Sequence, residues 1–409
     1  MNATTRIKAY LPALAVGLLF FAIHFLLIFH HVYVDASQKG ARISPGRHLE
    51  FPRPWHNWLD LNRWDAGHYE NIIVNGYRNA AQPHTPRPTI QWYPGYPLLA
   101  KSLCAITGAK PTLVFSGLSV VFTLAFWLVL WSPGMTAHFG RKTILLVSLL
   151  ILCWPGSFIW FAGMTEPLVA LLLVLILYLW VTRRPAWIFP VLGLATFTKQ
   201  PFVPAALVII LLDRLANGRK ILASLSLLLI SVSGFIAFGA YTFFCFGDFF
   251  ASSTMASKAF GILVNPFSLV DLANYARHID TLNGAVAAAT VLFLLAWGLK
   301  LAAPKQTGPF LKALFFRNPA PVSTELFLWS VALAYTAFVV LGSAYNQTLP
   351  FMSMLRYQSV NVCLFFLLAI LLRPVVGWKL MLMVVPLAWI GIYWQNVLTV
   401  NYWLWKWVA

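Results

Sequence analysis

The chain has 409 residues, of which 60% are hydrophobic and only 10% are charged, and it carries a formal net charge of +18. Apolar runs recur along most of it, each long enough to cross a hydrocarbon core of roughly 30 Å. This excludes a soluble protein and indicates a polytopic membrane protein. Lys and Arg stand mainly in short loops between the runs, as the positive-inside rule predicts, so topology explains the charge better than nucleic-acid binding does. The four cysteines are scattered singly and predict neither a disulfide framework nor a zinc site.

The first apolar run, residues 10–29, follows Arg6 and Lys8, which place the N-terminus in the cytoplasm. Because no small-residue cleavage motif follows this run, we interpret it as a retained span and not as a signal peptide. The polar segment 30–95 is then expected to form a large first external loop that contains interfacial helices.

The later apolar runs alternate between the two faces of the membrane, with the basic loops on the cytoplasmic side. The segment between the basic pairs 183–184 and 219–220 is too long for one span, yet it must return to its starting side. Proline removes an intrahelical hydrogen bond, so Pro201 predicts a helical hairpin with its tip at residues 198–201. The other spans are expected at about 111–131, 143–161, Glu166 to Arg183, 221–246, 284–300, 325–343, 357–372 and 377–395.

This path has about eleven spans and a second external loop, residues 247–283. The sequence shows no sustained repeat, heptad pattern or low-complexity tract, so residues 1–409 are expected to form one all-α polytopic membrane domain. The path also brings four features that are far apart in sequence to the external face. They are the stretch RWDAGHYENIIVNGY at 63–77, Glu166, Lys199 at the hairpin tip, and Arg356. Their convergence predicts an external site.

The stretch 63–77 is unusually rich in ionisable residues for this chain. If it forms a helix, Asp65 and His68 are three residues apart and can face one cavity. Such a pair could form a base with an orienting partner, or could bind an anion or a metal. Alternatively, Asp65 caps or charges the first turn of an interfacial helix and His68 is simply an interfacial aromatic residue.

Aromatic residues surround these ionisable groups. In QWYPGYPLLAK, Tyr93 and Tyr96 stand just before an apolar turn. They either shape a lipid-facing groove or belong to the aromatic belt of the membrane interface. The residues that we assign to a candidate substrate pocket are Arg63, Trp64, Tyr69, Tyr93, Tyr96 and Glu166.

Three charged residues outside this stretch add to the external face. Glu166 opens an apolar span, where an acid gains from the helix dipole, so it either charges the helix end or serves the site. Lys199 lies within an apolar hairpin, and a lysine there must pair, snorkel or serve a cavity. Arg356 stands where the positive-inside rule does not require it, and its planar guanidinium suits a phosphate.

Together these segments resemble a known family. RWDAGHY and WYPGYP resemble the motif pair Trp-Asp-x-x-His-Tyr and Phe-Pro-x-Tyr-Pro of the GPI mannosyltransferase 2 (PIG-V-like) family and its bacterial relatives. GMTEP, GLATFTKQP and SMLRYQ resemble three further segments of that family, in the same order. The chain departs from the family pattern at Lys199, where the family has arginine, at Leu355, where it has proline, and at Tyr93, where it has phenylalanine.

The resemblance implies an integral membrane glycosyltransferase of the GT-C type. Such an enzyme takes a sugar, typically mannose, from a polyprenyl- or dolichyl-phosphate donor and transfers it to a hydroxyl on the non-cytoplasmic face, here with inversion. It also implies that Asp65 is the catalytic base, that His68 assists, and that Arg356 and Lys199 bind the donor phosphate. Apart from the lipid-linked sugar no cofactor is implied, although Asp65, His68 and Glu166 could ligate a divalent metal.

Several alternatives stay open. A transporter or lipid flippase would also be polytopic, but it predicts two related halves with matching broken helices, and we see one break, at 198–201. The sequence does not identify the acceptor, so a glycolipid, a glycan and a protein all stay open. The expected partners are membrane lipids, the lipid-linked sugar and its acceptor, and no nucleic acid. Short loops favour a bacterial cytoplasmic membrane, with the endoplasmic reticulum membrane as the alternative.

Overall fold

The computed structural model describes residues 3–27, 64–78, 88–261, 263–302, 322–346 and 349–403. Within these ranges the chain is helical and has no strand, which agrees with the predicted all-α class. Arg63 of the candidate pocket, and most of the predicted first external loop, lie outside the described residues.

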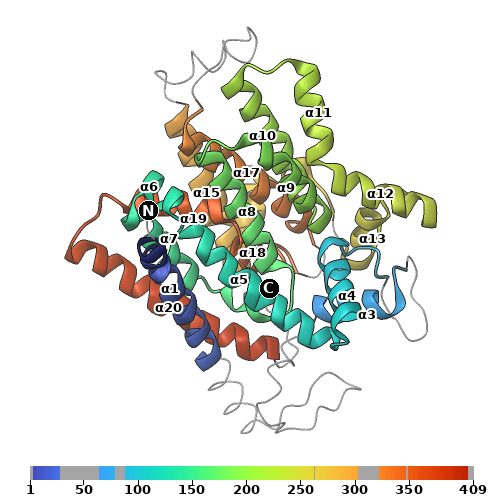
Figure 1. The fold of residues 1–409 in the computed structure, drawn as a ribbon, viewed down its shortest axis with the longest axis horizontal. Helices are drawn as coiled ribbons and strands as arrows, with labels where there is room; N and C mark the ends of the chain where they lie inside the picture. Colours follow the sequence, from blue (N-terminus) through green and yellow to red (C-terminus); the bar gives the residue numbers. More distant parts are fainter. Residues whose placement is uncertain are drawn as a thin grey trace.

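The helices are arranged around a buried centre rather than in separate units (Figure 1). In the first half of the chain they are α1 (Ala3–Leu27), α3 (Asp65–Asn75), α4 (Gly95–Thr107), α5 (Pro111–Leu130), α6 (Pro133–Phe139), α7 (Arg141–Cys153), the 3-10 helix η3 (Ser157–Phe161), α8 (Glu166–Val181), α9 (Pro185–Thr198) and α10 (Phe202–Asn217). In the second half they are α11 (Ile221–Ser231), α12 (Ser233–Phe246), α13 (Ala251–Phe260), η4 (Pro266–Leu269), α14 (Leu272–His278), α15 (Leu282–Leu301), α17 (Thr324–Ser343), α18 (Met354–Gln358), α19 (Val362–Leu372) and α20 (Trp378–Trp403).

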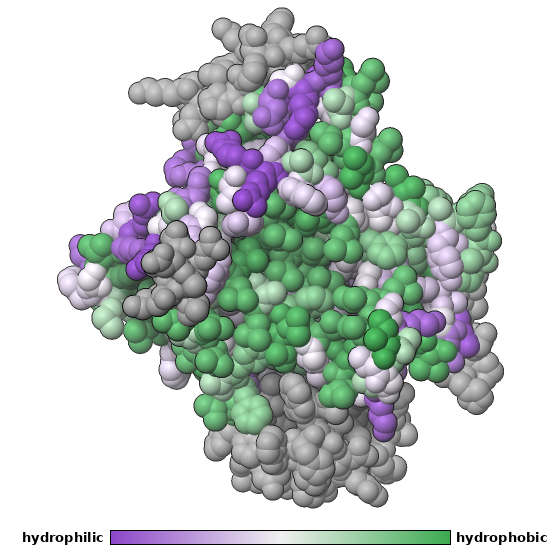
Figure 2. Space-filling view, viewed as in Figure 1, coloured by the Kyte–Doolittle hydropathy of each residue, from purple (hydrophilic) through white to green (hydrophobic). Residues whose placement is uncertain are grey.

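Four helices in the described ranges are long and apolar enough to cross a membrane, or six spans if each of two bent helix pairs counts as one. The four are α5, α15, α17 and α20, and the bent pairs are α6 with α7 and α11 with α12. Figure 2 shows hydrophobic residues covering much of the middle of one face of the molecule. These features are those of a helical membrane protein.

Several predicted spans are broken in the structure. The predicted span 143–161 ends as α7 at Cys153, because Trp154 precedes Pro155 and the residue before a proline disfavours the helical conformation. Span 221–246 is bent by 60° at Val232 between α11 and α12. Span 357–372 starts only at Val362, where Asn361 caps α19 by accepting from the Leu364 N–H. Hydropathy alone located the apolar segments but not these interruptions.

The predicted break at the hairpin tip is confirmed: α9 ends at Thr198 and α10 begins at Phe202. Lys199 is extended, with φ −158° and ψ 138°, and Pro201 precedes the first turn of α10. Proline fits at a helix start because its missing N–H has no intrahelical acceptor there. The tip is therefore residues 199–201, within the predicted 198–201.

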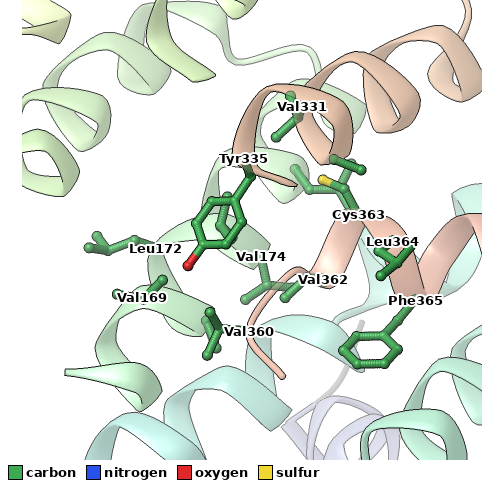
Figure 3. Packing of buried hydrophobic residues seen from close by; sticks show 14 of the residues in the cluster. Val169, Leu172, Val174, Val331, Tyr335, Val360, Val362, Cys363, Leu364 and Phe365 are labelled. Atoms are coloured by element: carbon green, nitrogen blue, oxygen red, sulfur yellow. The ribbon is translucent and has the colours of Figure 1, made fainter. Parts of the chain in front are cut away.

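Helix α8 lies at the centre of the molecule. It packs against α5, α9 and α19, and most of its residues are buried, including Val169 and Leu172. Figure 3 shows Tyr335 of α17 beside Val169 and Leu172 of α8, in the same hydrophobic cluster as Val360. Because the helix is apolar all round, it fits a fully enclosed position. Its first residue, Glu166, is consequently placed deep in the protein.

Candidate functional site

Four charged residues form a connected ion-pair network at the N-terminal end of α8. Arg356 Nη2 lies 2.6 Å from Asp65 Oδ2, and Arg356 Nε lies 2.6 Å from Glu166 Oε1. Lys199 Nζ lies 2.6 Å from the same Glu166 oxygen. These are the four features that the predicted topology placed on one face, and the structure brings them into direct contact.

Glu166 is the common partner of both cations. It opens α8, with Pro167 just inside the helix, and a carboxylate in the first turn is stabilised by the helix dipole. Its side chain is 0% exposed. A carboxylate at such a depth requires cationic partners, and Arg356 and Lys199 provide them.

Lys199 reaches the network from the tip of the hairpin. Its Nζ also donates to Thr165 Oγ1 at 3.3 Å and lies 4.8 Å from the centre of the Tyr357 ring. The α9 end that carries it packs tightly against Gly95 at the start of α4, where a Cβ would lie 2.6 Å from Thr198 Oγ1. The glycine of the WYPGYP segment thus permits the close approach that places Lys199.

Arg356 is presented by the short helix α18, which follows strained backbone. Phe351 and Ser353 have φ of 56° and 66°, a left-handed region that residues other than glycine rarely adopt. The helix is fixed by two hydrogen bonds: Trp154 Nε1 donates to Leu355 O at 2.8 Å, and Leu355 N donates to Asn283 Oδ1 at 3.1 Å. Backbone strain held in place by its surroundings is common at functional sites.

Gly156 allows the chain after α7 to touch this short helix. A Cβ at Gly156 would lie 2.3 Å from the carbonyl oxygen of Leu355, the residue before Arg356. We expect Gly156→Ala to push α18 away and to lower stability by about 1–3 kcal/mol, the usual cost of overpacking. Thermal unfolding of the purified protein measures this effect. Gly117→Ala is the control, because a Cβ at Gly117 meets no atom of the described residues within 4 Å. Equal melting temperatures for both variants would contradict the role assigned to Gly156.

Asp65 is the first residue of α3, and this helix confirms the predicted helical reading of the 63–77 stretch. Trp64 before it has φ 55°, a further strained position and one directly next to a network residue. Ala66, Tyr69 and Ile72 bury one face of α3 in the protein. Asp65 is the most exposed member of the network, at 18%, against 14% for Lys199 and 4% for Arg356.

A cavity of about 200 Å³ opens beside the network. Asp65, Lys199 and Arg356 all line it, whereas Glu166 is not among its lining residues. The other polar or aromatic residues of its wall are Tyr69, Gln91, Trp92, Tyr93, Thr165, Thr198, Gln200, Phe338, Ser343, Ser353 and Tyr357. One carboxylate and two cations therefore face a single cavity.

The remaining predicted site residues lie in different places. His68 is not among the lining residues; its ring stacks on Trp92, which is, with centroids 3.8 Å apart. Tyr69 and Tyr93 line the cavity. Tyr96 is fully buried in the core, where it stacks on Phe115, and Trp64 packs beside a separate cluster around Leu355.

Burial and the carboxylates of the network set the protonation states of Arg356 and Tyr69. Burial opposes the charge of the Arg356 guanidinium, but the carboxylates of Asp65 and Glu166 outweigh it and hold the pKa of Arg356 well above its ordinary value. Burial, followed by the Asp65 carboxylate, raises the pKa of Tyr69 well above its ordinary value. Arg356 is therefore a permanent cation, and Tyr69 is a neutral hydroxyl in the cavity wall.

Among the described residues, no three His, Cys, Asp or Glu side chains lie close enough together to hold a metal ion. Of the three residues named as metal ligands from the sequence, Asp65 and Glu166 both pair with Arg356, and His68 stacks on Trp92. Each of these three residues therefore has an ionic or an aromatic contact in the structure.

Sequence reasoning missed several wall residues. Gln91 is the first residue of QWYPGYPLLAK, and Tyr357 follows Arg356 in SMLRYQ, so both stood inside segments already singled out. Thr165 precedes Glu166 in the same way. Their position next to charged or aromatic motif residues was the signal in the sequence that could have identified them as wall residues.

No family model, curated protein or solved structure matches this chain.

Proposed function

We propose that this chain is an integral membrane glycosyltransferase of the PIG-V-like, GT-C type with about eleven spans. It would move a sugar, with mannose as the leading candidate, from a polyprenyl- or dolichyl-phosphate donor to a hydroxyl on the non-cytoplasmic face. The observation that carries the proposal is the cavity in which the Asp65 carboxylate, Lys199 and Arg356 meet. Sugar transfer from a lipid phosphate needs a base and cations in one place.

Asp65 is assigned as the base. Its ion pair with Arg356 uses Oδ2, so Oδ1 is the oxygen that an acceptor hydroxyl would meet. The acceptor oxygen attacks the anomeric carbon while its proton passes to the Asp65 carboxylate. The bond from the anomeric carbon to the phosphate oxygen breaks, its electron pair stays on the phosphate, and the configuration inverts.

Lys199 and Arg356 are assigned to the departing phosphate. Phosphate is already a good leaving group, so stabilising its charge matters more than protonating it. Both cations are held by Glu166 before any ligand arrives, and donors fixed in advance need no reorganisation during the reaction. The cavity is smaller than the range of about 300–1,000 Å³ that is typical of drug-sized ligands, which suits a sugar ring better than a whole lipid-linked donor.

The test is transfer by the purified chain in lipid vesicles. Polyprenyl-phosphate mannose with a labelled sugar is the donor, and a membrane-lipid extract together with a soluble mannoside supplies acceptors. We expect labelled product and free polyprenyl phosphate to form together. If the donor crosses the bilayer with its sugar still attached and no product forms, the chain is a flippase and the proposal is wrong.

The external position of the cavity can be tested separately. Lys258 in the second predicted external loop and Arg184 between α8 and α9 are both exposed. In a Cys245→Ser background, which removes the one exposed cysteine, we expect an impermeant maleimide to label Lys258→Cys on intact cells. Arg184→Cys should react only after permeabilisation. The reverse pattern would place the cavity on the cytoplasmic side.

A further inference from the structure

Gln91 is a wall residue of the cavity whose side-chain amide has no hydrogen-bond partner within the described part of the chain. Both polar atoms of its amide, Nε2 and Oε1, are buried and lack a hydrogen-bond partner among the described residues. Its backbone is nevertheless well fixed: the carbonyl accepts from Ser252 Oγ at 3.3 Å, and the neighbouring Trp92 N–H donates to Thr89 O at 3.3 Å. The protein therefore positions this residue firmly and leaves its amide unpaired.

An unpaired buried amide is unusual, because buried polar groups in proteins are nearly always hydrogen-bonded. A second glutamine of the same wall shows the ordinary arrangement. Gln200 Nε2 donates to Ser253 Oγ at 3.0 Å. Gln91 has the same functional group in the same cavity without such a bond, which points to a partner that enters with the ligand.

We infer that the Gln91 amide recognises neighbouring hydroxyls of the sugar ring held in this cavity. A primary amide offers an N–H donor and a carbonyl acceptor side by side, and two adjacent hydroxyls present the matching acceptor and donor. Trp92, the next residue, also lines the cavity and has its ring stacked on His68. An aromatic ring beside an amide matches a sugar ring, because the aromatic ring suits the apolar C–H face of the sugar and the amide suits its hydroxyls.

This inference rests on the proposed function and adds to it the residue that selects the sugar. The cations at Lys199 and Arg356 would bind the phosphate of any lipid phosphate, with or without a sugar. Gln91 would contribute only when a hydroxylated ring is attached. A site built to hydrogen-bond a hydroxyl discriminates strongly against a ligand that lacks it, because its polar groups are then left unpaired.

The experiment compares binding of polyprenyl-phosphate mannose and of sugar-free polyprenyl phosphate to the purified chain. Gln91→Met keeps the size of the side chain and removes the amide. We expect it to weaken binding of the mannose lipid by roughly tenfold, about the factor that one net hydrogen bond supplies, and to leave binding of the sugar-free lipid unchanged. Gln200→Met is the matched control, and it should not change the ratio of the two affinities.

A melting experiment separates this role from a structural one. Because Gln91→Met removes unpaired polar atoms, it should leave the melting temperature unchanged or raise it. A lower melting temperature with equal losses for both lipids would show a packing residue and overturn the inference. So would unchanged binding of both lipids, although the proposed function would stand. If the unmodified chain binds neither lipid, the proposed function fails and the inference fails with it.

Discussion

Replacing Asp65 by asparagine is expected to lower the rate of sugar transfer by about 10²–10⁴-fold, the factor that a positioned general base supplies. Asparagine keeps the size of the side chain, and its oxygen can still accept from Arg356 Nη2, which lies 2.6 Å from Asp65 Oδ2. The substitution therefore removes the base and leaves the position of Arg356 largely intact. The measurement is the single-turnover rate with polyprenyl-phosphate mannose.

Asp271→Asn is the control for this experiment. Asp271 is another acid of the predicted external loops, but it caps α14 through the Asn274 N–H and accepts from the Tyr345 hydroxyl. These bonds lower the pKa of Asp271, as is typical of a structural carboxylate, and it does not line the cavity. We expect the Asp271 variant to transfer sugar normally. Normal transfer by the Asp65 variant would refute the assignment of the base.

The second large effect is a loss of stability on replacement of Glu166. Replacing Glu166 by glutamine is expected to destabilise the fold by about 3–5 kcal/mol, the usual cost of breaking a buried ion pair by removing one partner. Glu166 is 0% exposed and its Oε1 lies 2.6 Å from both Lys199 and Arg356. Arg356 would keep Asp65, but Lys199 would lose its carboxylate. Thermal unfolding in detergent measures the loss.

Glu325→Gln is the matched comparison. Glu325 pairs with Lys300 at 3.4 Å, and the two side chains are 39% and 60% exposed. Exposed pairs of this kind contribute about 0–1 kcal/mol, so we expect little change in melting temperature. A Glu166 variant as stable as the Glu325 variant would mean that the network does not hold α8, α18 and the hairpin together.

Much of this architecture could be predicted from the sequence. Apolar run length located α5, α15 and α17 to within a few residues, and Pro201 located the hairpin tip. The positive-inside rule then put Asp65, Glu166, Lys199 and Arg356 on one side without any knowledge of contacts. The positive-inside rule assigns each loop to one of the two membrane faces. Residues that are far apart in sequence can therefore be grouped by the face on which their loops lie.

The side-chain contacts of the site could not be predicted, because the spacing of residues along the chain does not give the distances between different helices. The three-residue spacing of Asp65 and His68 placed them near one another on α3, but it could not show that His68 would stack on Trp92 while Asp65 met Arg356. Likewise, Tyr96 belongs to the same aromatic segment as Tyr93, yet it points into the core because α4 turns it towards Phe115. Motifs identified the segments, and packing decided which side chains reach the cavity.

The single oxygen of Glu166 that holds both Lys199 and Arg356 has a consequence for how the two cations can be compared. Replacing either Lys199 or Arg356 leaves the Glu166 carboxylate entirely to the remaining cation and removes a like charge beside it, since the two positively charged groups share one counterion. Effects of contacting residues in one network are not additive. The effect of each single replacement on activity would therefore include a change in the ion pair that Glu166 makes with the remaining cation. A variant that lacks both Lys199 and Arg356, compared with the two single variants, would separate their individual contributions from the shared one.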